Sequence, residues 1–298
     1  MKKLALSASA LLLIIISLLF TACHKAQMTN DGCYVNMEEA AKVAASKKKD
    51  LIVLATVENG DALSSNFLNM VVRTSDFASD FLKQYIVVHL DLSEGINNYA
   101  SLLNVSVTPS VYLLSKEGYY LDSFVFTEEF HTYGDFKKYF DGLQTTLVNK
   151  KALISAAQKG KPLDKLNSIN VLYDATPVEN RVSLLPLLAA AQKLDKANVS
   201  GLRGKMIYAY VDAAAIKAMS EGNIEETVRL YFTLEKESLV DAELRQQAIY
   251  TAAYICAMTQ TKTTSEIIEY LQKAISVNPD GKEVPGIQRV IDALREQN

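Results

Sequence analysis

The chain has 298 residues, of which 49% are hydrophobic and 22% are charged. This length accommodates two domains of ordinary size, and the composition is typical of a globular protein with a buried core. The formal net charge of −3 provides no strong basic field to attract a phosphate backbone, which argues against nucleic acid as a partner.

The first residues follow the pattern of an export signal. Two lysines after the first methionine form a positive n-region, residues 4–20 form an apolar stretch, and small residues precede Cys23. The apolar stretch is also long enough for an uncleaved membrane anchor. Cys23 directly after Ala22 resembles the lipobox of bacterial lipoproteins. That resemblance implies a signal peptide over residues 1–22 and acyl chains such as palmitate on Cys23, which would anchor the protein to a membrane.

Residues 23–35 are polar and lack apolar periodicity, which predicts a lipidated tether. Cys33 in this tether is expected to carry an exposed thiol. Cys256 lies in an apolar helical run, which favours a buried, inert thiol. A disulfide between the two stays open as an alternative, and neither cysteine belongs to a redox motif.

From residue 36 to residue 148 predicted helices alternate with predicted strands. Leu51–Val57 and Tyr85–Leu92 are apolar on both faces, so we expect central strands that are covered on both sides. The other predicted elements are a helix over Met37–Lys48 capped by Asn36, a helix capped by Ser64 or Ser65, a helix from Ser75, a short helix over Asn97–Leu103, strands over Ser110–Ser115 and Tyr120–Phe126, and a helix from Asp135.

This order of elements, with Thr108 and Pro109 before the third strand, resembles the thioredoxin fold. It is similar in particular to the C-terminal domain of the transmembrane thiol-disulfide reductase. The resemblance implies an α/β domain over residues 36–148 with a central mixed sheet and flanking helices. It also implies that Pro109 is a cis-proline facing the active-site loop, where active relatives hold extended substrate. Thr108 and Pro109 are therefore expected to bind peptide.

The reacting atoms of that family are missing from this chain. Where the family carries Trp-Cys-x-x-Cys, residues 61–65 read Asp-Ala-Leu-Ser-Ser. The two cysteine positions correspond either to Ala62 and Ser65 or to Asp61 and Ser64. Disulfide exchange needs a thiolate and a second cysteine to resolve the mixed disulfide, and a serine hydroxyl cannot replace the thiolate without a base. We therefore predict degenerate active-site positions, no catalytic residue and no enzyme activity.

Other chemistry finds little support in the sequence. Ser64 or Ser65, His89, and Asp61 or Asp91 are the residue types of a hydrolase triad. His89 lies within a predicted strand and no nucleophile elbow is present, so we expect a structural role for this histidine. His131 follows two glutamates, yet no second histidine or cysteine stands at ligand spacing. Neither a phosphate loop nor a dinucleotide fingerprint occurs. No metal and no cofactor are predicted.

After residue 148 helical periodicity continues to the end of the chain. Expected helices are Leu163–Tyr173, Val178–Leu194 with a kink at Pro186, Leu202–Ser220, Ile224–Glu235, Asp241–Met258, Ser265–Val277 and Val284–Glu296. Paired helices with short loops predict an all-α helical-hairpin domain over residues 149–298. Residues 221–226 and 270–279 resemble parts of a tetratricopeptide repeat, although that repeat has a period of about 34 residues and the units here start 39 apart, from Leu202 to Asp241.

Six tyrosines of the helical half could line a peptide-binding groove or fill the hairpin cores: Tyr208, Tyr210, Tyr231, Tyr250, Tyr254 and Tyr270. The whole sequence therefore favours a lipid-anchored protein of the cell envelope, on the periplasmic side or the cell surface. Its redox-inactive thioredoxin-like fold would serve as a protein-binding or peptide-binding scaffold. Two alternatives stay open: thiol-disulfide activity that uses Cys33 or a partner's thiol, and a purely structural envelope role.

Overall fold

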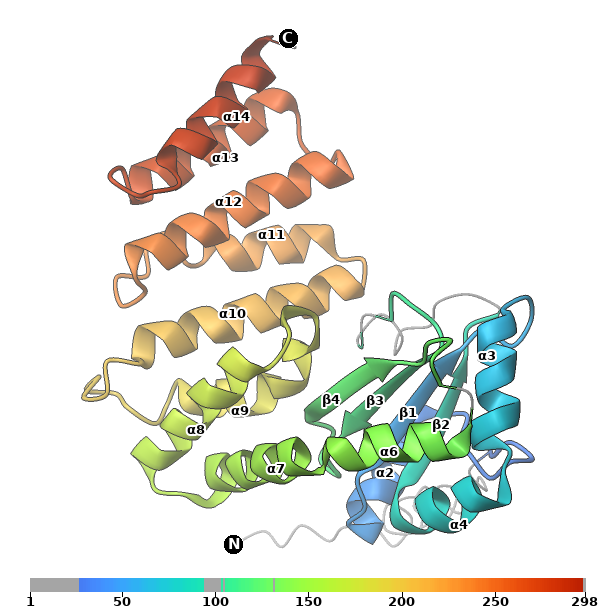
Figure 1. Ribbon diagram of the computed structural model, residues 1–298. Coiled ribbons are helices and arrows are strands. Elements are labelled where there is room, and N and C mark those ends of the chain that lie inside the picture. Colours follow the sequence, from blue (N-terminus) through green and yellow to red (C-terminus); the bar gives the residue numbers. More distant parts are fainter. Residues whose placement is uncertain (1–26, 94–102, 104, 131, 297–298) are drawn as a thin grey trace, which may run out of the picture.

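The computed structural model describes residues 27–93, 103, 105–130 and 132–296 (Figure 1). Cys23 with the export signal, most of the short helix expected over 97–103, and His131 lie outside the described residues. Figure 1 shows an α/β part at the lower right and a stack of helices that rises from it toward the C-terminus.

A four-stranded mixed sheet forms the centre of the α/β part, with the strand order β2-β1-β3-β4. The strands are β1 (Leu51–Thr56), β2 (Ile86–Asp91), β3 (Ser110–Leu114) and β4 (Tyr120–Val125). β2 is parallel to β1, whereas β3 is antiparallel to both β1 and β4. All six residues of β1 are buried, as expected for an aliphatic strand covered on both faces.

Helices cover both faces of this sheet. They are α2 (Met37–Lys47), α3 (Ala62–Phe67), the π-helix η1 (Leu68–Val72), α4 (Ser75–Gln84) and α6 (Tyr133–Gly142). Ala40 and Ala44 of α2 pack on one face, in the same cluster as Val53 of β1. Phe67 and Phe136 pack with Ile52 on the other face. These connections and this strand order define a thioredoxin-like fold, which confirms the predicted fold class.

The segment before α2 packs against the sheet. The Tyr34 N–H donates to the carbonyl of Val87 at 2.8 Å, and the His89 N–H donates to the carbonyl of Tyr34 at 2.8 Å. Cys33 is only 1% exposed, and burial, aided by the charge of Asp31, raises the pKa of its thiol to about 12. The prediction of an exposed Cys33 thiol in a tether is therefore wrong, because Tyr34 holds this segment against β2.

Antiparallel helix pairs form the second part of the chain. The elements are α7 (Gln144–Lys159), α8 (Pro162–Ala175), the 3₁₀ helix η2 (Val178–Leu184), α9 (Leu185–Ala191), α10 (Arg203–Ser220), α11 (Ile224–Phe232), α12 (Ala242–Thr259), α13 (Thr264–Val277) and α14 (Val284–Glu296). The predicted helical-hairpin domain is confirmed. Instead of a kink at Pro186, η2 gives way to α9 with the proline in its first turn, where the missing N–H costs no hydrogen bond.

α7 joins the two parts, since it runs without a break through the boundary that we predict after residue 148. η2 links them further along the chain. The Tyr120 N–H donates to Ser183 Oγ at 3.1 Å, and Asn180 Nδ2 donates to the carbonyl of Leu103 at 3.1 Å. In the described part of the chain, no helix is long and apolar enough to cross a membrane.

A buried polar network holds η2 against the helical stack. Asp212 of α10 is 6% exposed and pairs with Arg181 of η2, with Nη1 and Oδ2 3.2 Å apart. The hydroxyl of Tyr173 donates to Asp212 Oδ2 at 3.0 Å, and that of Tyr231 donates to Oδ1 at 3.2 Å. Three other elements therefore converge on one carboxylate.

Both described cysteines, Cys33 and Cys256, are buried and free. The disulfide that we left open between them is therefore not formed. Cys256 lies in the core shared by α12, α13 and α14 and is 0% exposed, as expected for a buried thiol.

Candidate functional site

The residues predicted to be degenerate active-site positions lie at the start of α3. The polar loop after β1 ends the strand, and Asp61 caps the helix: its Oδ1 accepts from the Leu63 N–H at 3.1 Å and its Oδ2 from the Ser64 N–H at 3.2 Å. A carboxylate suits this place because helix N-termini carry free N–H donors and a partial positive charge. The cap is thus Asp61, and not Ser64 or Ser65 as we expected.

Thr108 and Pro109 lie beside this cap. The peptide bond between them is cis. Thr108 Oγ1 donates to Asp61 Oδ2 at 3.4 Å, and the carbonyl of Pro109 accepts from the Phe126 N–H at 2.9 Å. Val107, the residue before them, has half of its surface exposed (50%). The fold therefore brings two separate predicted segments, the loop at 61–65 and Thr108-Pro109, to one surface.

The two candidate pairs of active-site positions differ in their contacts. Ser64 is fully buried, its Oγ donates to Asp61 Oδ2, and it accepts from the Val57 N–H at 3.1 Å. Ala62 is exposed, whereas the Ser65 hydroxyl donates to the carbonyl of Glu58 at 3.3 Å. Only Asp61 and Ser64 have side chains that touch each other, three residues apart, as a resolving pair of cysteines would.

The hydrogen bonds of this pair affect the charge of Asp61 and the reactivity of Ser64. Partial burial raises the pKa of Asp61, but hydrogen bonds from Ser64, from the Leu63 N–H and from Thr108 outweigh it, so the pKa lies below its usual value. Asp61 is therefore an anion at neutral pH. Ser64 is enclosed and donates its proton to that anion, so its hydroxyl is not free to attack a substrate.

His89 does not complete a triad with Ser64. Its Nε2 lies 2.7 Å from Thr56 Oγ1, and the side chain is 8% exposed. Asp91 Oδ1 instead accepts from the Glu58 N–H at 3.1 Å and from Ser93. Ser64, His89 and Asp91 therefore make separate contacts, which favours the structural role that we expected for His89.

His89 gives the protein a pH-dependent stability. Burial lowers its pKa below the ordinary 6.5, against the opposing charges of Glu58 and Asp91. The unfolded state then binds more protons, so this contribution is present above about pH 6.5 and is lost as the pH falls below it. We expect the stability advantage of the wild type over His89→Gln to shrink between about pH 7.5 and pH 5 in urea unfolding. An advantage that stays constant or grows toward acid pH would contradict this role.

A polar cavity of about 540 Å³ opens next to His89 and was not foreseen, since its rim is the segment we assigned to a tether. Arg73 spans the rim, with ion pairs to Asp31 at 3.2 Å and to Glu58 at 2.8 Å. Across residues 27–93, 103, 105–130 and 132–296, no three His, Cys, Asp or Glu side chains are grouped to hold a metal ion.

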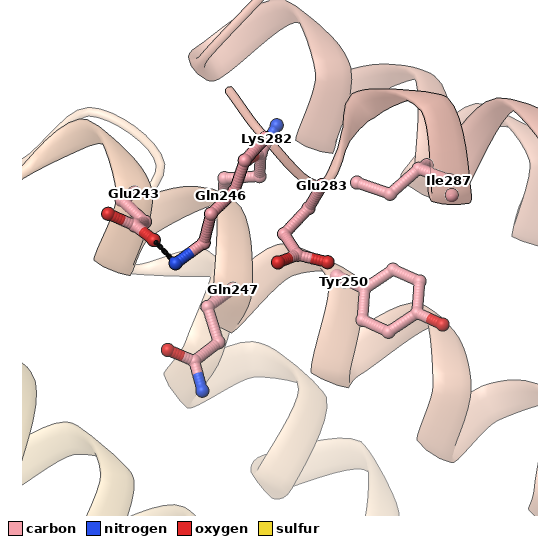
Figure 2. Close-up of a pocket in the computed structure, with 8 residues that line it drawn as sticks. Glu243, Gln246, Gln247, Tyr250, Lys282, Glu283 and Ile287 are labelled. Carbon is pink, nitrogen blue, oxygen red and sulfur yellow. Dashed lines mark ion pairs between the residues drawn. The ribbon is translucent and has the colours of Figure 1, made fainter.

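A second cavity, of about 440 Å³, lies in the helical stack between α12 and the start of α14 (Figure 2). Its lining consists of Glu243, Gln246, Gln247, Tyr250, Lys282, Glu283, Gly286 and Ile287. The tyrosines of the helical half are found both in the core and on the surface. Tyr208 and Tyr231 are buried in the core, while Tyr254 is 55% exposed. The helical spacing of Gln247, Tyr250 and Tyr254 could have shown from the sequence that they share one face of α12. The cavity itself could not be predicted, because α14 comes close to α12 only in the folded chain.

The structure thus consists of a thioredoxin-like domain with no cysteine in residues 61–65, joined to an array of helical hairpins. Residues 202–298, which include the second cavity, match a protein-family model described as "Uncharacterised protein C-terminal domain". An "Uncharacterized protein" of Treponema pallidum (strain Nichols) is 28% identical over 104 residues. That match spans 35% of each chain, so only about a third of the Treponema protein is represented.

Among solved structures, one titled "DsbH Oxidoreductase" matches with a TM-score of 0.31 and 13% sequence identity. It covers 43% of this chain and 96% of that one. This similarity is too low to support the fold assignment, which depends on the strand order and connections described above.

Proposed function

We propose that this protein is a lipid-anchored component of the cell envelope whose thioredoxin-like part binds an extended segment of another protein without thiol chemistry. The observation that carries the proposal is the surface formed by Asp61 and Thr108. Among the described residues, the backbone N–H and C=O of Thr108 have no hydrogen-bond partner, and Val107 beside them is exposed. Free backbone groups of this kind can pair with an extended peptide as a neighbouring strand does.

The same surface supports binding in preference to reaction. Asp61 and Ser64 take the two active-site positions, so the surface contains no sulfur, and the Asp61 carboxylate keeps its negative charge at neutral pH. A thiol reaction through Cys33 finds no support, because that thiol is buried and its pKa is raised to about 12. The helical array would extend the area available to a partner.

Site-specific photocrosslinking in intact cells tests the proposed surface. A benzophenone amino acid in place of Val107 is expected to give a discrete crosslinked product with another envelope protein. The matched control is Val171 of α8, which is 46% exposed and lies in the helical part. Equal products from both positions, or none from position 107, would count against binding at Thr108.

Membrane attachment is tested separately at Cys23. Each buried methylene of an acyl chain contributes about 0.8 kcal/mol to membrane binding, so a multiply acylated cysteine anchors a protein stably. We expect the wild type to incorporate a labelled fatty acid and to sediment with membranes. The Cys23→Ser variant should lose the label. Retention of the label in that variant would contradict lipidation at this residue.

A further inference from the structure

The cavity between α12 and the start of α14 is lined by more acidic than basic side chains. Glu243, Glu283 and Lys282 line it together with Tyr250 and Gln247. Lys282 Nζ lies 2.7 Å from Glu243 Oε1, the ion pair marked in Figure 2. Among the described residues, Glu283 has no ion pair, and Figure 2 shows its side chain pointing toward the Tyr250 ring. With two carboxylates and one ammonium group in its lining, the cavity has a net negative charge, and an aromatic ring lies beside it.

An anionic ligand suits this cavity poorly. The start of α14 and Lys282 are positive groups, but Lys282 already pairs with Glu243. The Glu283 carboxylate itself lies next to the helix N-terminus and repels a second anion there. A cation, by contrast, gains from the Glu283 charge and from the face of an aromatic ring.

Exposed apolar side chains continue from the cavity along α12. Tyr254 is 55% exposed and Met258 is 66% exposed. They follow Gln247 and Tyr250 at helical spacing, so all four share one face of the helix. On α14, Val290 is 39% exposed and lies one turn beyond Gly286 of the cavity. A ligand seated in the cavity would thus meet exposed apolar side chains further along the same face of α12.

We propose that this cavity and the adjoining face of α12 bind a polypeptide segment of a partner that presents a lysine or arginine side chain followed by apolar residues. The cation enters the cavity between Glu283 and Tyr250, and the apolar residues lie on Tyr254 and Met258. The Gln247 amide is placed to hydrogen-bond the backbone of the segment. This site is separate from the surface at Thr108, and it lies within the region that the family model matches.

Labelled peptides that differ at one position test the charge preference. Three fluorescein-labelled dodecapeptides would share a leucine and a phenylalanine after a central lysine, glutamine or glutamate. With detergent-solubilised full-length protein, we expect the lysine peptide to bind about tenfold more tightly than the glutamate peptide at low salt in fluorescence anisotropy. Equal affinities, or no binding of the lysine peptide up to about 1 mM, would overturn the proposal.

A matched pair of variants tests the assigned carboxylate. Glu283→Gln should weaken binding of the lysine peptide about fivefold and leave the glutamine peptide unchanged. Glu269→Gln, on the exposed surface of α13, should alter neither. Identical effects of the two variants would assign the preference to net charge and overturn the site. Glu283 belongs to the helical part of the chain and Val107 to the α/β part. Failure of the peptide to bind near Glu283 would therefore leave the expected crosslink at residue 107 unaffected.

Discussion

Asp61→Cys/Ser64→Cys is expected to convert this protein into an insulin reductase. The two positions lie three residues apart at a helix N-terminus, their side chains touch, and Thr108 contacts the first of them. A thiolate at residue 61 would be stabilised by the helix N–H groups that now bind the carboxylate, and residue 64 would resolve the mixed disulfide. Dithiothreitol-dependent insulin precipitation should rise on the order of tenfold above the wild type, whose rate should equal that of dithiothreitol alone.

The other register provides the control. In Ala62→Cys/Ser65→Cys the same two sulfurs are added, but residue 62 is exposed and residue 65 faces the carbonyl of Glu58. We expect little or no gain in activity. Equal activity of both double variants, or strong activity of the wild type, would contradict the geometry assigned to the loop.

Asp212→Ala is expected to lower the free energy of unfolding by about 3 kcal/mol, the largest effect we anticipate from one substitution in the helical part. The change leaves the Arg181 guanidinium without its ion pair in a largely buried place, and it removes the acceptor of the Tyr173 and Tyr231 hydroxyls. A buried charge or donor without a partner carries the full cost of its lost hydration. Urea unfolding monitored by circular dichroism measures the effect.

Asp174→Ala serves as the comparison for that prediction. Asp174 of α8 pairs with Lys205 of α10 at 2.7 Å, but its side chain is 51% exposed. Exposed pairs contribute about 0–1 kcal/mol, so this variant should unfold almost as the wild type does. A similar decrease in the free energy of unfolding in both variants would show that the buried network around Asp212 contributes no more to stability than an exposed ion pair does.

Much of the fold could be predicted because local pattern and tertiary packing agree. The unbroken aliphatic run of β1 and the helical spacing of Phe77 and Phe81 in α4 each specify their element. The helices from α10 to α14 begin and end within a few residues of the predicted bounds. The prediction of a tether with an exposed Cys33 was wrong because this short segment has no periodicity of its own. It is held by the contacts of Tyr34 with β2, which the sequence does not reveal.

The candidate site was only partly predictable. The loop and Thr108-Pro109 could be named from the resemblance to thioredoxins, but the choice between Asp61 and Ala62 depended on which side chain caps the helix. That choice follows from hydrogen-bond geometry, which the spacing of residues does not contain. The cavities beside His89 and beside Tyr250 are formed by segments far apart in the sequence, so no local pattern could place them.

A tryptophan placed at the proposed surface measures polypeptide binding most directly. The chain has no tryptophan, so Val107→Trp introduces a single reporter beside Thr108. Titration with reduced, carboxymethylated insulin B chain, which has no free thiol, should give a saturable change in its emission, while Val171→Trp should not respond. A saturable response at residue 107 alone is the result we predict. Emission that stays unchanged at residue 107, or that changes equally at both positions, would contradict binding at this surface.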